Sequence, residues 1–70
     1  MAFREGNCVS WRWGRGTAYG RVREIFREEV ERAIKGQQIK RRASPEEPAY
    51  LIEQDDGDIF LKSHSELTKA

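Results

Sequence analysis

Two aromatic residues flank a glycine-containing turn in an arginine-rich part of the chain. Trp13 and Tyr19 lie on either side of residues 14–16, whose two glycines indicate a tight turn between strands. Aromatic rings can stack on nucleobases and guanidinium groups can contact phosphates, which is the combination that single-stranded nucleic acid requires. The pattern therefore predicts a nucleic-acid-binding surface around Trp13 and Tyr19. The arginines expected in this surface are Arg12, Arg15, Arg21, Arg23 and Arg41.

The same two rings support a second hypothesis, in which they form an aromatic cage around a cationic or methylated side chain of a protein partner. Cation–π attraction would supply the binding energy, and Asp55, Asp56 and Asp58 would add negative charge nearby. In a third interpretation, an exposed edge strand adds to a partner's sheet or to a second copy, giving a weak dimer instead of a monomer. In a fourth, the exposed rings cover the ends of a small core, play a structural role and bind no ligand.

Groups that could perform catalysis are scarce. His64 is the only histidine, and it lies between Ser63 and Ser65 in a short capping sequence. A serine nucleophile needs a base and an orienting acid brought together by the fold, which neighbours on one turn do not supply. The aspartates near residue 56 lack the ligand spacing of a calcium loop, and the single cysteine, Cys8, offers no metal-binding pair. We therefore expect no enzyme activity, no cofactor and no metal site.

Length and composition fit one small domain, residues 1–70, with 37% hydrophobic side chains. A single cysteine suits a reducing cytoplasm. The charged N-terminal residues lack the apolar segment of a signal peptide, and no run approaches the length of a membrane span, so we expect a cytoplasmic protein without membrane contact. The net charge of +1 is divided unevenly, since residues 1–42 carry +6 and residues 43–70 carry −5. The basic half favours an anionic partner, unless the two halves neutralise each other within the fold.

Alternating apolar residues predict the strands that would carry these groups. Val9, Trp11 and Trp13 alternate with polar residues, and a second strand begins at Thr17. Gly20 within that second strand indicates a close approach of another chain segment.

An acidic, glycine-centred turn between two apolar runs is the strongest hairpin signal in the chain. Asp56 and Gly57 stand between Ile52 and Ile59, and Asp-Gly is typical of a two-residue type I′ turn. Residues 63–66 then match a capping box, which predicts a short helical turn. The expected core residues are Leu51, Ile52, Ile59 and Leu61, together with the rings of Trp11, Phe26 and Phe60.

Residues 21–35 carry conflicting signals. Their apolar residues follow the spacing of an amphipathic helix, and glutamate, arginine and alanine favour helices. However, no N-cap residue precedes this segment, and the strands on either side of it need partners. Gly36 ends the segment, and the basic residues 37–42 are typical of an edge strand. The local pattern leaves both a helix and a pair of strands open.

A set of short motifs runs through the chain at specific spacing. They are Gly6, VSW at residues 9–11, glycines at 16 and 20, KG at 35–36, RAS at 42–44, PAY at 48–50, DG at 56–57 and KSHSEL at 62–67. Together they resemble the hypervirulence-associated protein TUDOR domain family, small bacterial and fungal proteins earlier grouped as a domain of unknown function. The resemblance implies an all-β binding module, a small SH3-like or TUDOR-like barrel of about five strands with a short helical turn near the C-terminus. It also implies that residues 21–35 form two strands with a turn near residues 27–29.

Overall fold

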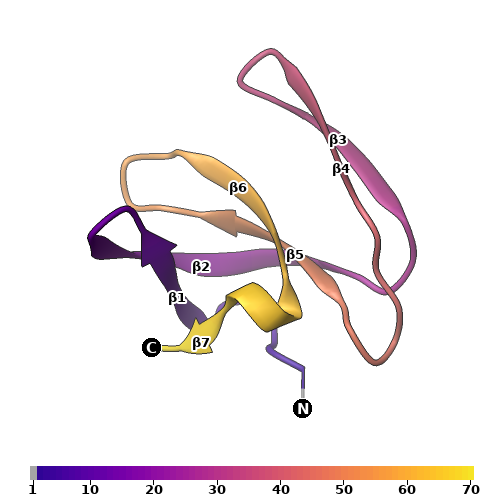
Figure 1. Ribbon diagram of the computed structural model, residues 1–70, viewed down its shortest axis with the longest axis horizontal. Helices are drawn as coiled ribbons and strands as arrows, with labels where there is room; N and C mark the ends of the chain where they lie inside the picture. Colours follow the sequence, from indigo (N-terminus) through magenta and orange to yellow (C-terminus); the bar gives the residue numbers. More distant parts are fainter. Residues whose placement is uncertain (1) are drawn as a thin grey trace.

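The chain folds into antiparallel strands and one short 3-10 helix, as the computed structural model of residues 2–70 shows (Figure 1). The strands β6, β5, β2, β1 and β7 form a five-stranded sheet in that order, while β3 and β4 form a separate two-stranded sheet. The all-β fold and the helical turn expected near the C-terminus are confirmed. The elements are β1 (Cys8–Trp13), β2 (Gly16–Phe26), β3 (Val30–Ile34), β4 (Gln37–Arg41), β5 (Ala49–Glu53), β6 (Ile59–Ser63), η1 (His64–Glu66) and β7 (Thr68–Lys69). Within the described residues, no helix is long and apolar enough to cross a membrane.

Residues 21–35 form strands on both sides of a corner at residues 27–29, as the family resemblance implied. The hairpin expected from these two strands is wrong, however, because β2 pairs with β5 and β3 pairs with β4. The helix-like spacing has a local cause. The register of β2 shifts between Val22 and Glu24, and the extra residue of such a bulge lets Val22 and Ile25 pack on the same core cluster. Phe26 packs on the other cluster, so one strand produces apolar residues three and four positions apart.

The tight turns differ from the expectation at the acidic hairpin. The type I′ geometry occurs between β3 and β4, where Lys35 and Gly36 both have positive φ, 52° and 78°. The turn at Asp56 and Gly57 is instead a three-residue connection, because Gln54 N donates to Asp58 O at 2.8 Å and closes the loop. The two-residue turn expected there is wrong. Its physical reason is that Asp56 Oδ1 accepts the N–H of Asp58 at 2.9 Å, which leaves Gly57 as the loop residue with positive φ.

The core is divided between the two faces of β5. Tyr50 and Ile52 belong to one cluster, with Val9, Trp11, Val22 and Leu67, whereas Ala49 belongs to a second cluster with Val30 and Leu61. Alternate residues of a strand point to opposite faces, so β5 is covered on both sides. The β3–β4 hairpin covers the second face, since Val30, Ile34 and Ile39 pack there.

The expected core residues are distributed over these two clusters. Trp11, Ile52 and Leu61 are buried, whereas Phe26, Phe60 and Leu51 are half-buried and pack against the clusters from their edges. Ile59 is also half-buried. The close approach expected at Gly20 is present, because a Cβ there would lie 2.5 Å from Ile52 Cγ2 and 3.1 Å from Glu53 O.

Candidate functional site

The β1–β2 hairpin carries most of the residues that the sequence singled out. Trp13 pairs with Gly16, so the turn consists of Gly14 and Arg15. Gly14 takes φ +56°, a conformation that glycine adopts without a clash of a Cβ atom. Side chains of directly paired residues lie on the same face of a sheet. The register therefore decides which of the candidate side chains can act together.

Trp13 and Tyr19 lie on opposite faces of this hairpin. Trp13 is two residues from Trp11 on β1, so its side chain points to the same face of the sheet as the core. It lies beyond the edge of the core, and 67% of the residue is exposed. Tyr19 pairs with Ser10 on the other face and is 61% exposed. They are the large hydrophobic residues that residues 2–70 leave exposed. Because the sheet separates them, the two rings do not form facing walls of one cage, and a ligand contacts both by passing around the hairpin.

Three of the candidate arginines surround these rings without an ion-pair partner. Arg12 pairs with Thr17 and Arg21 with Cys8, which places both on the face of Tyr19. Arg15 occupies the turn, and all three arginines are exposed. Within the described residues, none of the five ion pairs uses them. Their guanidinium groups can therefore accept an anionic ligand without first breaking a salt bridge.

The other two candidate arginines are already engaged. Arg23 Nε donates to Glu53 Oε1 at 2.7 Å, across the β2–β5 pair. Arg41 lies on β4, in the other sheet, and its Nε donates to Leu61 O at 3.2 Å. The fold brings Arg12, Arg15 and Arg21 together with the aromatic residues, whereas Arg41 belongs to a different surface.

The acidic loop between β5 and β6 reaches the candidate surface at one residue. Asp55 lines a shallow hollow of about 370 Å³ with Tyr19, Arg21, Cys8, Gly20 and Ala70. Asp58 points elsewhere and pairs with Lys35 at 3.1 Å. Among the three aspartates, Asp55 is thus the one that lies with Tyr19, so this hollow combines one ring with one carboxylate and one guanidinium.

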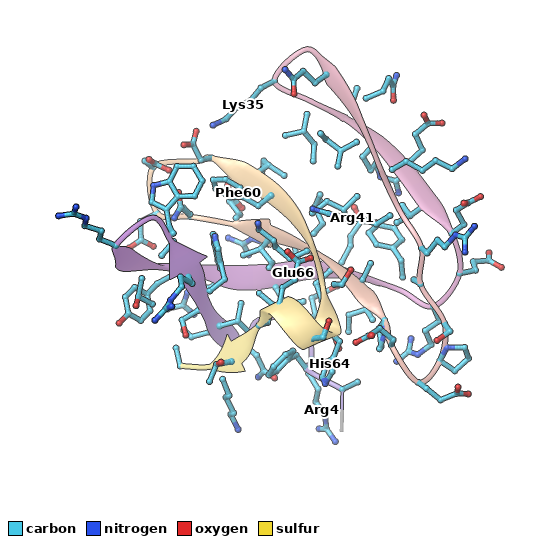
Figure 2. All side chains as sticks on the ribbon, in the orientation of Figure 1. Arg4, Lys35, Arg41, Phe60, His64 and Glu66 are labelled. Carbon is cyan, nitrogen blue, oxygen red and sulfur yellow. The ribbon has the colours of Figure 1, made fainter. Side chains whose placement is uncertain are left out.

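His64 has a structural partner. Its Nδ1 lies 3.1 Å from the hydroxyl of Tyr50, and Phe3 N donates to the same hydroxyl at 3.1 Å. The hydroxyl accepts from Phe3 N and shares a second hydrogen bond with the His64 ring, whose donor is set by the histidine tautomer. Figure 2 shows His64 and Arg4 at the same end of the molecule. The histidine therefore joins the N-terminal segment to η1, and Glu66 Oε1 accepts the N–H of Ser63 at 2.9 Å in the expected cap.

Two features of the molecule were not predicted from the sequence. Tyr50 is fully buried, although its hydroxyl is polar, because it has two hydrogen-bond partners. The unbroken apolar stretch at residues 48–52 is the signal for a strand that is buried on both faces. The second feature is the set of basic side chains between β4 and β6, which are too far apart in sequence to form a recognisable motif. Among the described residues, no three histidine, cysteine, aspartate or glutamate side chains gather in a way that could hold a metal ion.

Comparison with curated proteins and with solved structures gave no match. The model of one protein family does match, over residues 6–67, and its description is "Hypervirulence associated proteins TUDOR domain". The matched region includes β1 to β6 and η1 and ends before β7. TUDOR-type domains are binding modules, which agrees with a surface of exposed rings and unpaired arginines. The chain belongs to the hypervirulence associated proteins TUDOR domain family, and it is a small binding module.

Proposed function

We propose that this module binds single-stranded nucleic acid through the β1–β2 hairpin. The observation that carries the proposal is the coincidence of two features on one hairpin. The exposed rings of Trp13 and Tyr19 lie there, and so do three arginines that make no ion pair within residues 2–70. Exposed aromatic surface promotes association, and free guanidinium groups beside it supply the charge that a phosphate backbone requires.

The opposite orientation of the two rings determines how a strand would bind. Tyr19, Arg12 and Arg21 form one face, on which a base stacks over the phenol ring while the guanidinium groups contact the flanking phosphates. Arg15 at the turn contacts the phosphate backbone of the nucleic acid where it passes around the tip of the hairpin. Trp13 stacks on a base from the other face. The hairpin acts as a projection around which the strand bends. Asp55 in the hollow beside Tyr19 disfavours a phosphate at that point and sets the direction of the path.

Fluorescence anisotropy with a labelled single-stranded oligonucleotide tests this proposal. With three phosphate contacts, the slope of log K against log salt is about −2 for a single strand, so affinity falls roughly twentyfold between 50 and 200 mM salt. The variant Arg12→Gln/Arg15→Gln/Arg21→Gln removes the salt dependence and most of the affinity. Arg27→Gln is the matched control, because Arg27 is exposed at the β2–β3 corner, away from the hairpin tip. Absence of binding at 50 mM salt, or an equal loss in the control, would overturn the proposal.

Tryptophan fluorescence separates the roles of the two rings. Trp13 is exposed and Trp11 is 4% exposed, so stacking on Trp13 quenches the solvent-exposed part of the emission. Trp13→Ala and Tyr19→Ala should each weaken binding by about 1–3 kcal/mol, the value of one base–aromatic stack. If both substitutions leave the affinity unchanged while the arginine variant abolishes it, binding is electrostatic and the stacking part of the proposal is wrong.

A further inference from the structure

The β6 strand has an open edge that faces the β3–β4 hairpin. β6 is the terminal strand of the five-stranded sheet, and β4 approaches it without forming a strand pair. Hydrogen-bonded pairs alternate along an antiparallel ladder. The bonds from Gln54 N to Asp58 O and from His64 N to Pro48 O extend the β5–β6 ladder at its two ends. They show that the even-numbered residues of β6 form their backbone hydrogen bonds with β5. The N–H and C=O groups of Ile59, Leu61 and Ser63 consequently point to the open edge.

Side chains, instead of a neighbouring strand, cap this edge. Arg41 Nε donates to the C=O of Leu61 at 3.2 Å, and Glu66 Oε1 accepts the N–H of Ser63 at 2.9 Å. Both bonds go to groups that the alternation places on the outer side. Figure 2 shows Arg41 between the β3–β4 hairpin and β6, and Lys35 extending from the hairpin tip toward the β5–β6 loop. A single arginine thus occupies the position that a backbone donor of an added strand would take.

Two adjoining hollows lie along this edge. One, of about 190 Å³, is bounded by β4 and β6, and the other, of about 310 Å³, lies between the hairpin tip and the β5–β6 loop. They share Ile34, Lys35 and Ile59. The apolar residues of the first hollow are Ile34, Ile39, Ile59, Phe60 and Leu61. The edge is therefore an apolar cleft, and no strand pairs with the outward backbone groups along its β6 wall.

The charge around the first hollow has one sign. Lys35, Arg41 and Lys62 line it, and no carboxylate does. The ion pair of Lys35 with Asp58, at 3.1 Å, is exposed, and that of Lys62 with Glu66, at 3.7 Å, is half-buried at the lysine, so an incoming carboxylate competes most readily for Lys35. A second copy of this chain is a poor occupant, because antiparallel pairing of two β6 edges would bring three cationic side chains from each copy together.

We propose that the β6 edge is a strand-addition site for an extended segment of a partner protein in which acidic residues alternate with apolar ones. Paired strands lie about 4.8 Å apart and β4 already contacts β6, so the β3–β4 hairpin moves outward to admit the added strand. The incoming backbone then donates to Leu61 O in place of Arg41, and the released guanidinium pairs with a carboxylate of the added strand. Ile59 and Leu61 present apolar side chains on one face and Lys62 lies on the other, so an alternating pattern matches the two-residue period. The site is separate from the β1–β2 hairpin and does not depend on nucleic-acid binding there.

The test uses the full chain, labelled with ¹⁵N, and two synthetic peptides of ten residues with blocked ends. One peptide alternates glutamate with valine and the other alternates lysine with valine. The glutamate peptide should shift the amide signals of Ile59 and Leu61 and slow their hydrogen exchange at least about tenfold, because both N–H groups gain an acceptor. The lysine peptide should do neither. An oligonucleotide in the same experiment reports on the β1–β2 hairpin, so failure at one site is distinguishable from failure at the other.

Charge reversal provides the matched variants. Arg41→Glu should weaken binding of the glutamate peptide at least about tenfold, while Arg42→Glu, a neighbouring arginine that does not line the cleft, should not. If Arg41→Glu does not fold, Ile59→Pro removes one outward donor and leaves the β5–β6 ladder intact. The proposal is overturned by an absence of shifts at about 1 mM peptide or by equal binding of both peptides. It is also overturned if sedimentation shows a dimer that protects the β6 amides without peptide.

Discussion

Two hairpins of the same sheet use the same residue types in opposite ways. The β1–β2 hairpin leaves a tryptophan and a tyrosine exposed and keeps Arg12, Arg15 and Arg21 out of every ion pair within residues 2–70. The β5–β6 hairpin buries its tyrosine and receives Lys35 and Arg41 from the neighbouring hairpin as an ion-pair partner and a cap. Residue type therefore does not identify a binding surface in this domain. What distinguishes the two hairpins is whether an intramolecular partner already satisfies each polar or aromatic group.

This difference follows from what packs against each hairpin. β5 is covered on both faces, so its side chains must be apolar or fully hydrogen-bonded, and Tyr50 meets that requirement through Phe3 and His64. The tip of the β1–β2 hairpin extends beyond both clusters and has no such constraint. A small domain with a small core can hold a projecting hairpin of this kind, because its inner residues are anchored.

The largest effect on the free energy of unfolding is expected at Gly20, where the β1–β2 hairpin packs against the core. Gly20→Val places a Cβ 2.5 Å from Ile52 Cγ2 and should cost about 3 kcal/mol of unfolding free energy through overpacking. Gly16→Ala is the control, because the nearest atom to its Cβ would be Trp13 O at 3.9 Å. Urea denaturation followed by tryptophan fluorescence measures both. Equal stabilities of the two variants would mean that the hairpin is not anchored at Gly20.

The two tyrosines give the next largest contrast. Tyr50→Phe removes the hydroxyl that joins Phe3 N and His64 Nδ1, leaves both without that partner and should cost about 1–2 kcal/mol. Tyr19→Phe removes an exposed hydroxyl and should change stability by less than about 0.5 kcal/mol. Thermal denaturation compares them directly. A similar cost for both would contradict the assignment of Tyr50 to structure and Tyr19 to a surface.

The sequence predicts the parts of this fold whose signals are local. The alternation around Val9 and Trp11 and the apolar runs on either side of Gly57 correspond to observed strands, and residues 63–66 contain the observed helical turn. The middle of the chain could not be assigned locally, because the bulge at residue 23 shifts the parity of β2 and imitates helical spacing. Its strands were correctly expected only through the family resemblance, and the partner of each strand depends on contacts that are distant in sequence.

The relation between Trp13 and Tyr19 depended on a single residue of register. A three-residue turn at residues 14–16 would pair Trp13 with Thr17 and place both rings on one face. The observed two-residue turn pairs Trp13 with Gly16 and separates them. The cleft beside β6 could not be predicted from the sequence for another reason. Lys62 is distant in sequence from Lys35 and Arg41, and the three come together only because two hairpins pack against each other.

A smaller effect is expected for the arginines of the two regions. Arg41→Met keeps the apolar stem, removes the donor to Leu61 O and should cost about 1 kcal/mol. The same change at Arg12, which makes no ion pair within residues 2–70, should stay within about 0.5 kcal/mol. Urea denaturation midpoints report the difference. If Arg12→Met were the more destabilising, the arginine of the β1–β2 hairpin would have a structural role.

The smallest effect concerns the ion pair that links the two hairpins beside the cleft. A double-mutant cycle with Lys35→Gln and Asp58→Asn should give a coupling of about 0.5 kcal/mol at low salt and less at high salt, since both side chains are largely exposed. The Arg23–Glu53 pair, at 2.7 Å, is the comparison, because its partners lie on paired strands of one sheet. Breaking Lys35–Asp58 should also speed amide exchange at the β3–β4 tip, where no strand ladder connects the two hairpins, whereas breaking Arg23–Glu53 should not. Faster exchange without a loss of global stability would show that this pair holds the β3–β4 tip beside the β5–β6 loop and contributes little to the fold.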